Sequence, residues 1–196
     1  TACTLVANPD FKKIKESNFS KYYFETIEKT YESYGESELL KLWKKEGIRN
    51  NLFYPQFHGR EHLNAKKWIS ILKHGSETER AAFNENTLLG LSQAYNNSDQ
   101  NYMAAFESIN DEHKEEIKRI AIEGLAIFEK IFGFKSISFM PSQSKQFKEL
   151  NETLIKEGVK FNQGGQHFIK NENGFFKKVD KCWGDKDTCG MTYWRR

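Results

Sequence analysis

The chain alternates between short apolar runs and longer segments whose apolar residues recur at helical spacing. The short runs predict strands at residues 4–8, 51–57, 135–141 and 159–163. The helical spacing, with capping residues before it and glycine after it, predicts helices at residues 36–47, 63–75, 77–95, 111–132 and 146–156. Residues 11–34 are aromatic and charged without a clear period, and we expect them to wrap the outside of the fold.

Strands that alternate with helices indicate an α/β fold with a parallel sheet and right-handed crossovers, as a barrel or an open layer. At 196 residues the chain is expected to form a single domain, residues 1–196. In a parallel sheet the loops that follow the strands meet at one edge, where such folds carry their chemistry. These loops are at residues 8–10, 58–62, 141–143 and 163–167.

The most informative of these loops contains two histidines. His58 and His62 are four residues apart, where a predicted strand ends and a helix begins. Two imidazoles at this spacing can converge on one divalent metal ion. The alternative interpretation is that they only form hydrogen bonds within a loop. His74 and His113 fall on polar stretches of predicted helices and are expected at the surface.

Composition excludes several classes of protein. The net charge of +3 is too small to indicate nucleic-acid binding, and lysines alternate with acidic residues as on solvated helix faces. No apolar run reaches the roughly 20 residues of a membrane span. We therefore expect a soluble protein, bacterial cytoplasmic or exported. Cys182 and Cys189 are expected either to form a disulfide or to be free thiols, with Cys3 unpaired.

Two segments resemble the NodB-type polysaccharide deacetylases (carbohydrate esterase family 4). The stretch from His58 to His62, H-G-R-E-H, is similar to the H-[ST]-x-x-H metal motif of that family. The stretch S-F-M-P-S-Q at residues 138–143, with the helix and glycine turn after it, resembles the F-R-P-P-Y motif. The resemblance covers residues 52–163, and the chain is similar to a divergent fragment of a longer barrel.

The resemblance implies a partial or distorted (β/α) barrel with several long helices and one metal ion, most often zinc. Two histidines and an aspartate hold the metal, and a water activated by it attacks an acetyl group on a polysaccharide or oligosaccharide. On this basis His58 and His62 are the expected metal ligands, and Pro141 and Gln143 line the substrate groove.

The remaining roles have weaker matches. Asp10 is the one early residue that matches the paired aspartates of the family, as metal ligand or catalytic base. His167 is nearest by position to the histidine that supplies the general acid, although a structural or surface role is an alternative. Met140 stands where the family has arginine, and Gln143 where it has tyrosine.

Two other functions use the same residues. The stretch also matches H-x-x-E-H, the inverted zinc-peptidase motif, with Glu61 as the base and Glu123 or Glu129 as a further ligand. That motif requires both histidines in one helix, whereas Pro55 and Gly59 favour a strand end. The second alternative is a catalytically inactive carbohydrate-binding relative, in which aromatic residues such as Phe53, Tyr54, Trp183 and Trp194 stack on sugar rings.

Overall fold

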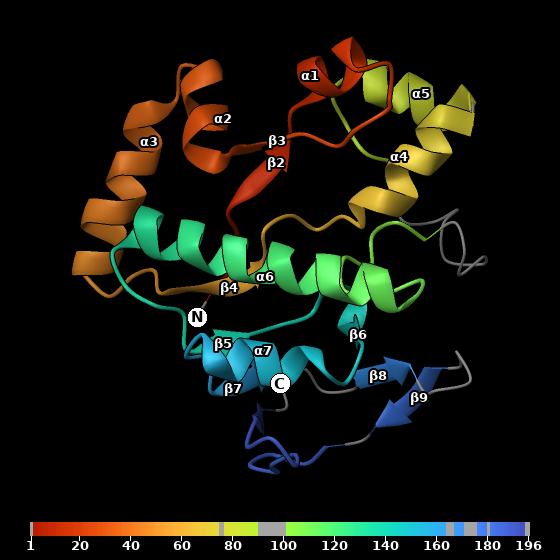
Figure 1. Cartoon of the computed structure of the whole chain (residues 1–196). Coiled ribbons are helices and arrows are strands. Elements are labelled where there is room, and N and C mark those ends of the chain that lie inside the picture. Colours follow the sequence, from red (N-terminus) through yellow and green to blue (C-terminus); the bar gives the residue numbers. More distant parts are fainter. Residues whose placement is uncertain are drawn as a thin grey trace.

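A parallel five-stranded sheet forms the centre of the protein in the computed structural model (Figure 1). The structure describes residues 2–74, 77–89, 101–163, 167–170, 176–179 and 181–194. The strands lie in chain order across the sheet: β1 (Ala2–Leu5), β4 (Pro55–Gly59), β5 (Ser138–Phe139), β7 (Phe161–Gln163) and β10 (Thr192–Trp194). All neighbouring pairs are parallel, which confirms the expected mixed α/β architecture. The carboxyl ends of these strands therefore share one edge of the sheet.

One face of the sheet is apolar and packs against helices. Phe57 pairs with Phe139 in the register of β4 and β5, and both side chains are fully buried. The long helix α6 (Asp111–Phe132) crosses in front of this face (Figure 1). Phe128 on that helix meets Phe57 edge to face, with ring centroids 6.4 Å apart. Helix α7 (Leu150–Lys156) packs beside α6 and continues the same apolar core.

The opposite face of the sheet carries polar side chains. Side chains alternate along a strand, so Gln56 and His58 both point away from the face that holds Phe57. The Gln56 side-chain oxygen accepts hydrogen bonds from the backbone N–H and the hydroxyl of Ser138, both at 2.8 Å. It also accepts from the Ser136 hydroxyl at 3.1 Å. These bonds fix the register between β4 and the next strand, and with it the position of His58.

The remaining elements surround the sheet. The other helices are α1 (Phe11–Glu16), α2 (Ile27–Ser33), α3 (Ser37–Leu42), a π-helical turn (Trp43–Gly47), α4 (Ala65–His74) and α5 (Glu77–Asn84). Two small sheets pair β2 (Ala7–Pro9) with β3 (Phe24–Thr26), and β6 (Lys145–Gln146) with β8 (His167–Lys170) and β9 (Phe176–Val179). In the described residues no helix is both long and apolar enough to cross a membrane.

Residues 11–34 contain α1, β3 and α2, elements that the sequence pattern did not predict. Helix α1 is six residues long, too short to show a period, and Ile14 is its one buried side chain. Ile14 joins a second apolar cluster with Trp68 and Phe83. The helix is therefore defined by its tertiary packing rather than by its sequence pattern.

The expectation for His113 was wrong. Helix α6 has the predicted bounds, begins after an Asn110 side chain that caps it, and ends at Gly133 in the left-handed conformation. His113 lies in its first turn and is only 2% exposed. Its Nδ1 accepts a hydrogen bond of 3.2 Å from the backbone N–H of Ile109. The loop before the helix thus covers this histidine, whereas His74 is exposed as expected.

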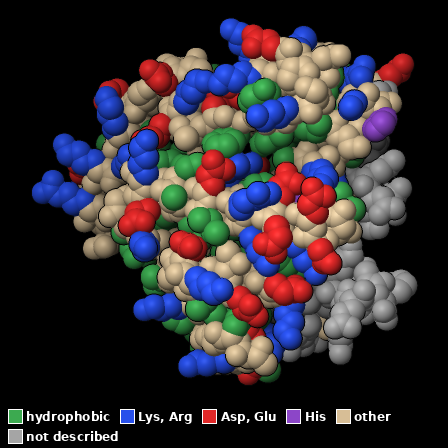
Figure 2. All heavy atoms as spheres, in the orientation of Figure 1, with side chains coloured by type: hydrophobic (Ala, Val, Ile, Leu, Met, Phe, Trp, Pro, Cys, Tyr) green, Lys and Arg blue, Asp and Glu red, His purple; other side chains and the backbone are tan. Residues whose placement is uncertain are grey.

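Charged side chains of both signs are mixed over the face that carries α6 (Figure 2). Many of them pair along or between helices. Lys118 lies 2.6 Å from Glu115 one turn earlier, and Lys114 lies 3.3 Å from Glu149 of the neighbouring segment. This is the solvated helix face that the alternation of lysine and acidic residues predicted.

Candidate metal centre

His58 lies near the carboxyl end of β4, on the polar face of the sheet. Its Nδ1 is 2.8 Å from the backbone carbonyl oxygen of Met140, which follows β5. A carbonyl oxygen only accepts hydrogen bonds, so the proton of a neutral His58 ring is on Nδ1. The Nε2 atom then carries the lone pair. A metal-binding histidine is commonly oriented in this way, through a hydrogen bond from its other nitrogen to a carbonyl group.

His62 comes back to His58 through a turn at Gly59. The φ angle of Gly59 is 143°, and a Cβ at this position would lie 3.0 Å from the carbonyl oxygen of Glu61. Glycine therefore permits the turn. The ring centroids of His58 and His62 are 5.1 Å apart, with their planes inclined by 58°. The two imidazoles therefore lie close together as expected, but a turn after a strand brings them together and not a helical turn.

The Nδ1 atom of His62 is buried and has no hydrogen-bond partner among the described residues. A buried polar atom without a partner costs roughly 1–3 kcal/mol, and such atoms are uncommon in folded proteins. A bound ligand at this ring would remove that cost. His62 thus fits the role of a metal ligand better than that of a histidine whose bonds are all satisfied within a loop.

Burial favours the neutral form of both rings. Burial lowers the pKa of His58, and the nearby His62 lowers it further, against the opposing effect of the hydrogen bond to Met140. Burial also lowers the pKa of His62, although backbone groups of His62 and Met103 act in the opposite direction. Only the neutral imidazole binds a metal, so these shifts favour metal binding at neutral pH.

Asp10 takes part in a different set of contacts. Its side chain accepts a hydrogen bond of 3.0 Å from the backbone N–H of Lys13 and caps α1. It also forms ion pairs with Lys13 at 3.1 Å and Lys29 at 3.8 Å. Burial alone would raise the pKa of Asp10, but the hydrogen bonds and the two lysines outweigh burial and lower the pKa. The carboxylate is thus ionised and already paired.

Asp10 also lines a cavity of about 500 Å³ whose walls include neither histidine of the pair. Within the described residues no three His, Cys, Asp or Glu side chains come together at a metal-binding distance. The structure therefore shows two of the three expected ligands side by side. The backbone of His167 lies in β8, but its side chain is outside the described part of the chain.

Pro141 and Gln143 lie in the turn that follows β5, next to the carbonyl group that holds His58. Pro141 is buried. Gln143 has a φ angle of 53°, in the left-handed region, and so does Ser144 at 56°. The Ser142 hydroxyl accepts a hydrogen bond of 2.8 Å from the backbone N–H of Ala105. That bond ties the turn to residues 101–109, a connecting segment for which the sequence pattern gave no role.

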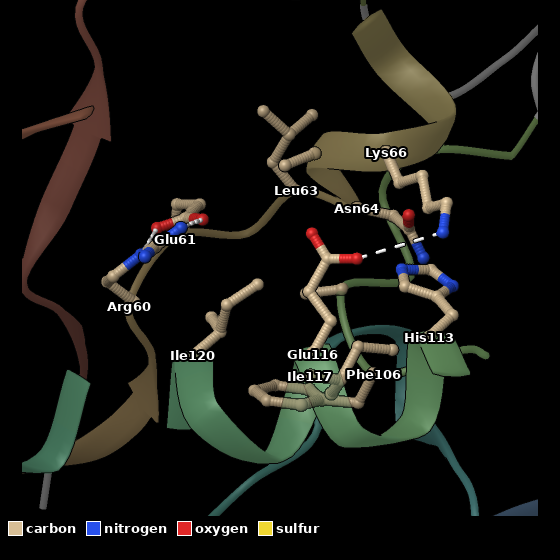
Figure 3. A pocket seen from close by; sticks show the side chains of 12 residues that line it. Arg60, Glu61, Leu63, Asn64, Lys66, Phe106, His113, Glu116, Ile117 and Ile120 are labelled. Atoms are coloured by element: carbon tan, nitrogen blue, oxygen red, sulfur yellow. Dashed lines mark hydrogen bonds and ion pairs between the residues drawn. The ribbon is translucent and has the colours of Figure 1, made fainter. Parts of the chain in front are cut away.

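The carboxylate of Glu61 lies against the guanidinium group of Arg60 (Figure 3). Two parallel hydrogen bonds of 2.6 Å join the two side chains, which are both buried. A third guanidinium nitrogen of Arg60 donates to Glu123 on α6. The cavity beside them has a volume of about 10 Å³, about enough for one water molecule. His58 lies in a strand rather than a helix, so these residues do not form the inverted zinc-peptidase motif.

Two of the aromatic residues considered for sugar binding pack against the protein itself. Phe53 stacks on Trp43 with centroids 4.6 Å apart, and Tyr54 stacks on Phe134 at 5.2 Å.

Trp194 lies in a stack at the edge of the sheet. Its ring centroid is 4.0 Å from that of Phe161 and 5.7 Å from that of Trp183. Trp183 is 70% exposed, which leaves its outer face available to a ligand. The three cysteines, Cys3, Cys182 and Cys189, are free thiols and form no disulfide.

Sequence reasoning missed the residues that orient the site. Met140 acts through its backbone carbonyl, which no sequence pattern marks. Asn101 donates a hydrogen bond of 2.6 Å to the side-chain oxygen of Gln143 from a segment 42 residues away. The role of Gln56 could have been predicted from the sequence, since a side-chain amide within an apolar run needs hydrogen-bond partners when it is buried.

Comparisons of the chain with models of protein families, with curated proteins and with solved structures found no match. The geometry around His58 and His62 is therefore the basis on which a function can be inferred.

Proposed function

We propose that this protein is a metal-dependent deacetylase that acts on an acetylated polysaccharide or oligosaccharide. His58 and His62 are two ligands of its divalent metal ion, which in such sites is most often zinc. The observation that carries this proposal is the pair itself. The ring centroids of the two imidazoles lie 5.1 Å apart at the carboxyl edge of a parallel sheet, and one ring has a buried nitrogen without a hydrogen-bond partner among the described residues. The five parallel strands follow one another in chain order, which is compatible with a partial (β/α) barrel, and in such a barrel this edge is the usual place for catalysis.

Each residue of the proposed site would have a separate role. His58 and His62 hold the metal, and the Met140 carbonyl keeps the His58 ring in the orientation and tautomer that a metal ligand requires. The metal would lower the pKa of a bound water towards roughly 7 and polarise the acetyl carbonyl. The turn that contains Pro141 and Gln143 forms the wall of the site on the side of β5 and faces the acyl group of the substrate.

The substrate class is supported by the resemblance of two segments to the NodB-type deacetylases, His58–His62 and residues 138–143. The chemistry also favours a carbohydrate. Trp183 offers an exposed aromatic surface of the kind that packs against sugar rings.

The pairing of Asp10 with two lysines favours one alternative, a carbohydrate-binding protein without hydrolytic activity. A deacetylase needs a carboxylate that accepts a proton at the metal. In this structure Asp10 is bound instead to Lys13 and Lys29. Both functions use the histidine pair, but only the deacetylase releases acetate.

The first test measures zinc binding by isothermal titration calorimetry at pH 7.5. We expect the wild-type protein to bind one zinc ion, and His58→Ala and His62→Ala to lose that binding. His74→Ala is the matched control, since this histidine is exposed on α4 and lies outside the pair. Wild-type protein that binds no zinc, or binding that survives both substitutions, would refute the metal centre.

The second test measures acetate released from acetylated chitooligosaccharide and acetylated xylan by the zinc-loaded protein. Release that depends on His58 and His62 supports the deacetylase. Binding of these oligosaccharides without release of acetate supports the carbohydrate-binding alternative.

A further inference from the structure

The turn after β5 holds Gln143 in a conformation that is unfavourable for a residue with a side chain. Gln143 and Ser144 are consecutive left-handed residues, with φ angles of 53° and 56°. Each such residue costs roughly 1–3 kcal/mol and persists where surrounding contacts enforce it, often at ligand sites. Here the contacts are the Ser144 N–H donating to the Pro141 carbonyl at 3.0 Å, and the Ser142 hydroxyl bonded to Ala105.

The side-chain amide of Gln143 is oriented by Asn101. The Asn101 Oδ1 accepts a hydrogen bond of 3.1 Å from the backbone N–H of Met103, so the other end of that amide must be the donor. Its Nδ2 donates to Gln143 Oε1 at 2.6 Å. The free end of the Gln143 amide is therefore Nε2, and rotation of the amide by 180° would place two NH₂ groups against each other.

The Nε2 atom of Gln143 is buried and has no hydrogen-bond partner among the described residues. The Nδ1 atom of His62 is another such atom in a loop at this edge of the sheet. Residues 101–105 join the two loops. Asn64, two residues after His62, donates from its backbone N–H to the Tyr102 carbonyl at 2.6 Å, while Ala105 is bonded to Ser142. These bonds tie together the two loops that carry the unsatisfied atoms of His62 and Gln143.

We infer that the side-chain Nε2 of Gln143 donates a hydrogen bond to the acyl oxygen of the substrate, and that Asn101 positions it. This inference rests on the proposed function and assigns a group that recognises the acetyl carbonyl. An amide N–H₂ suits this role because it donates without carrying charge, and because it is already oriented before the substrate arrives. The strained turn holds the donor in place.

The test compares Gln143→Glu and Gln143→Met with the wild-type, zinc-loaded protein. Glu keeps the shape of the side chain and an oxygen for Asn101, but replaces the donor with an acceptor. Met keeps the length and has no N–H donor. We expect kcat/KM for acetate release from acetylated chitooligosaccharide to fall by about 100-fold in both, as for loss of a single oxyanion donor. Zinc affinity should stay within about threefold of wild type, because Gln143 is not a metal ligand.

Asn101→Asp tests the positioning and leaves Gln143 in place. The aspartate keeps the acceptor for Met103, but it cannot donate to Gln143. The Gln143 amide should then turn its NH₂ group toward Asp, and kcat should fall while KM changes less. Asn101→Ser is the comparison, since a hydroxyl group can still donate and should preserve more of the activity.

A separate measurement follows the binding of ¹³C-labelled acetate to zinc-loaded protein by NMR. We expect weaker binding to Gln143→Met than to wild type. If the wild-type protein binds zinc but the variants release and bind acetate as it does, this inference is overturned and the metal centre stands. If wild-type protein neither binds zinc nor releases acetate, the proposed function fails, and the role of Gln143 fails with it.

Discussion

The Nδ1 atom of His58 lies 2.8 Å from the carbonyl oxygen of Met140, a residue 82 positions later in the chain. This contact crosses from β4 to the end of β5, so the orientation of the imidazole depends on the register of the parallel sheet. It also determines which nitrogen of the ring is free to bind a metal.

The contact predicts the tautomer of His58. In metal-free protein at pH 7.5 the proton of the ring should be on Nδ1, because the Met140 carbonyl can only accept. Long-range ¹H–¹⁵N NMR spectra distinguish the two tautomers directly. His74, exposed on α4, provides an internal comparison with a mixture of tautomers. A proton on Nε2 of His58 would show that this nitrogen is not available to a metal.

The lowered pKa values predict how stability depends on pH. Because burial lowers the pKa of His58 and His62 below the usual value of about 6.5, the unfolded chain binds more protons than the folded protein once the pH falls below that value. The stability contributed by the neutral rings is therefore fully present above pH 6.5. It is lost as the pH falls from 6.5 toward the lowered pKa values.

Thermal unfolding at pH 7.5 and pH 5.5 measures this effect. The melting temperature should fall on acidification, and it should fall less in a variant that carries both His58→Asn and His62→Asn. The carboxylates are the same in both proteins, so the difference isolates the histidines. An equal fall in the two proteins would contradict the lowered pKa values.

The buried ion pair of Arg60 and Glu61 predicts a structural role for Glu61. Removal of one partner leaves the other charge buried, which costs about 3–5 kcal/mol in the free energy of unfolding. Glu61→Gln should therefore destabilise the protein by several kcal/mol in urea denaturation, with zinc affinity unchanged. Glu129→Gln, exposed on α6, is the matched control and should change stability by less than about 0.5 kcal/mol. A stable Glu61→Gln protein without activity would instead indicate a catalytic base.

Gly124 lies where helix α6 packs closely against the sheet, so a larger residue at this position is predicted to lower the stability of the protein. A Cβ at this position would lie 2.8 Å from Cζ of Phe57 and 3.0 Å from Cβ of Arg60. Overpacking of this kind costs about 1–3 kcal/mol. Gly124→Ala should thus destabilise the protein, although alanine favours a helix over glycine by about 1 kcal/mol.

Ala126→Gly, exposed two residues later on the same helix, measures the effect of helix propensity alone and serves as the control for Gly124→Ala. Chemical denaturation of both variants gives the comparison. If Gly124→Ala were more stable than wild type, helix propensity would dominate, and α6 would not be in close contact with β4.

The sequence by itself determined the features that depend on neighbouring residues. The alternation of strands and helices predicted a parallel sheet, and the apolar spacing at residues 111–132 gave the bounds of α6. The pattern before His58 placed this histidine near a strand end, and the short separation of four residues, with a turn at Gly59, leaves His62 beside it. These predictions succeeded because periodicity and local turns decide them.

Only the tertiary structure decided which side chains meet. Asp10 caps α1 and pairs with Lys29, Glu61 pairs with Arg60, and His113 is covered by the loop before it. The same is true of Asn101, which orients Gln143 from a distant segment. Such contacts depend on the paths of loops and on strand register, which join residues far apart in the chain. The histidine pair could therefore be found from its spacing, whereas the groups that surround it could be found only in the folded protein.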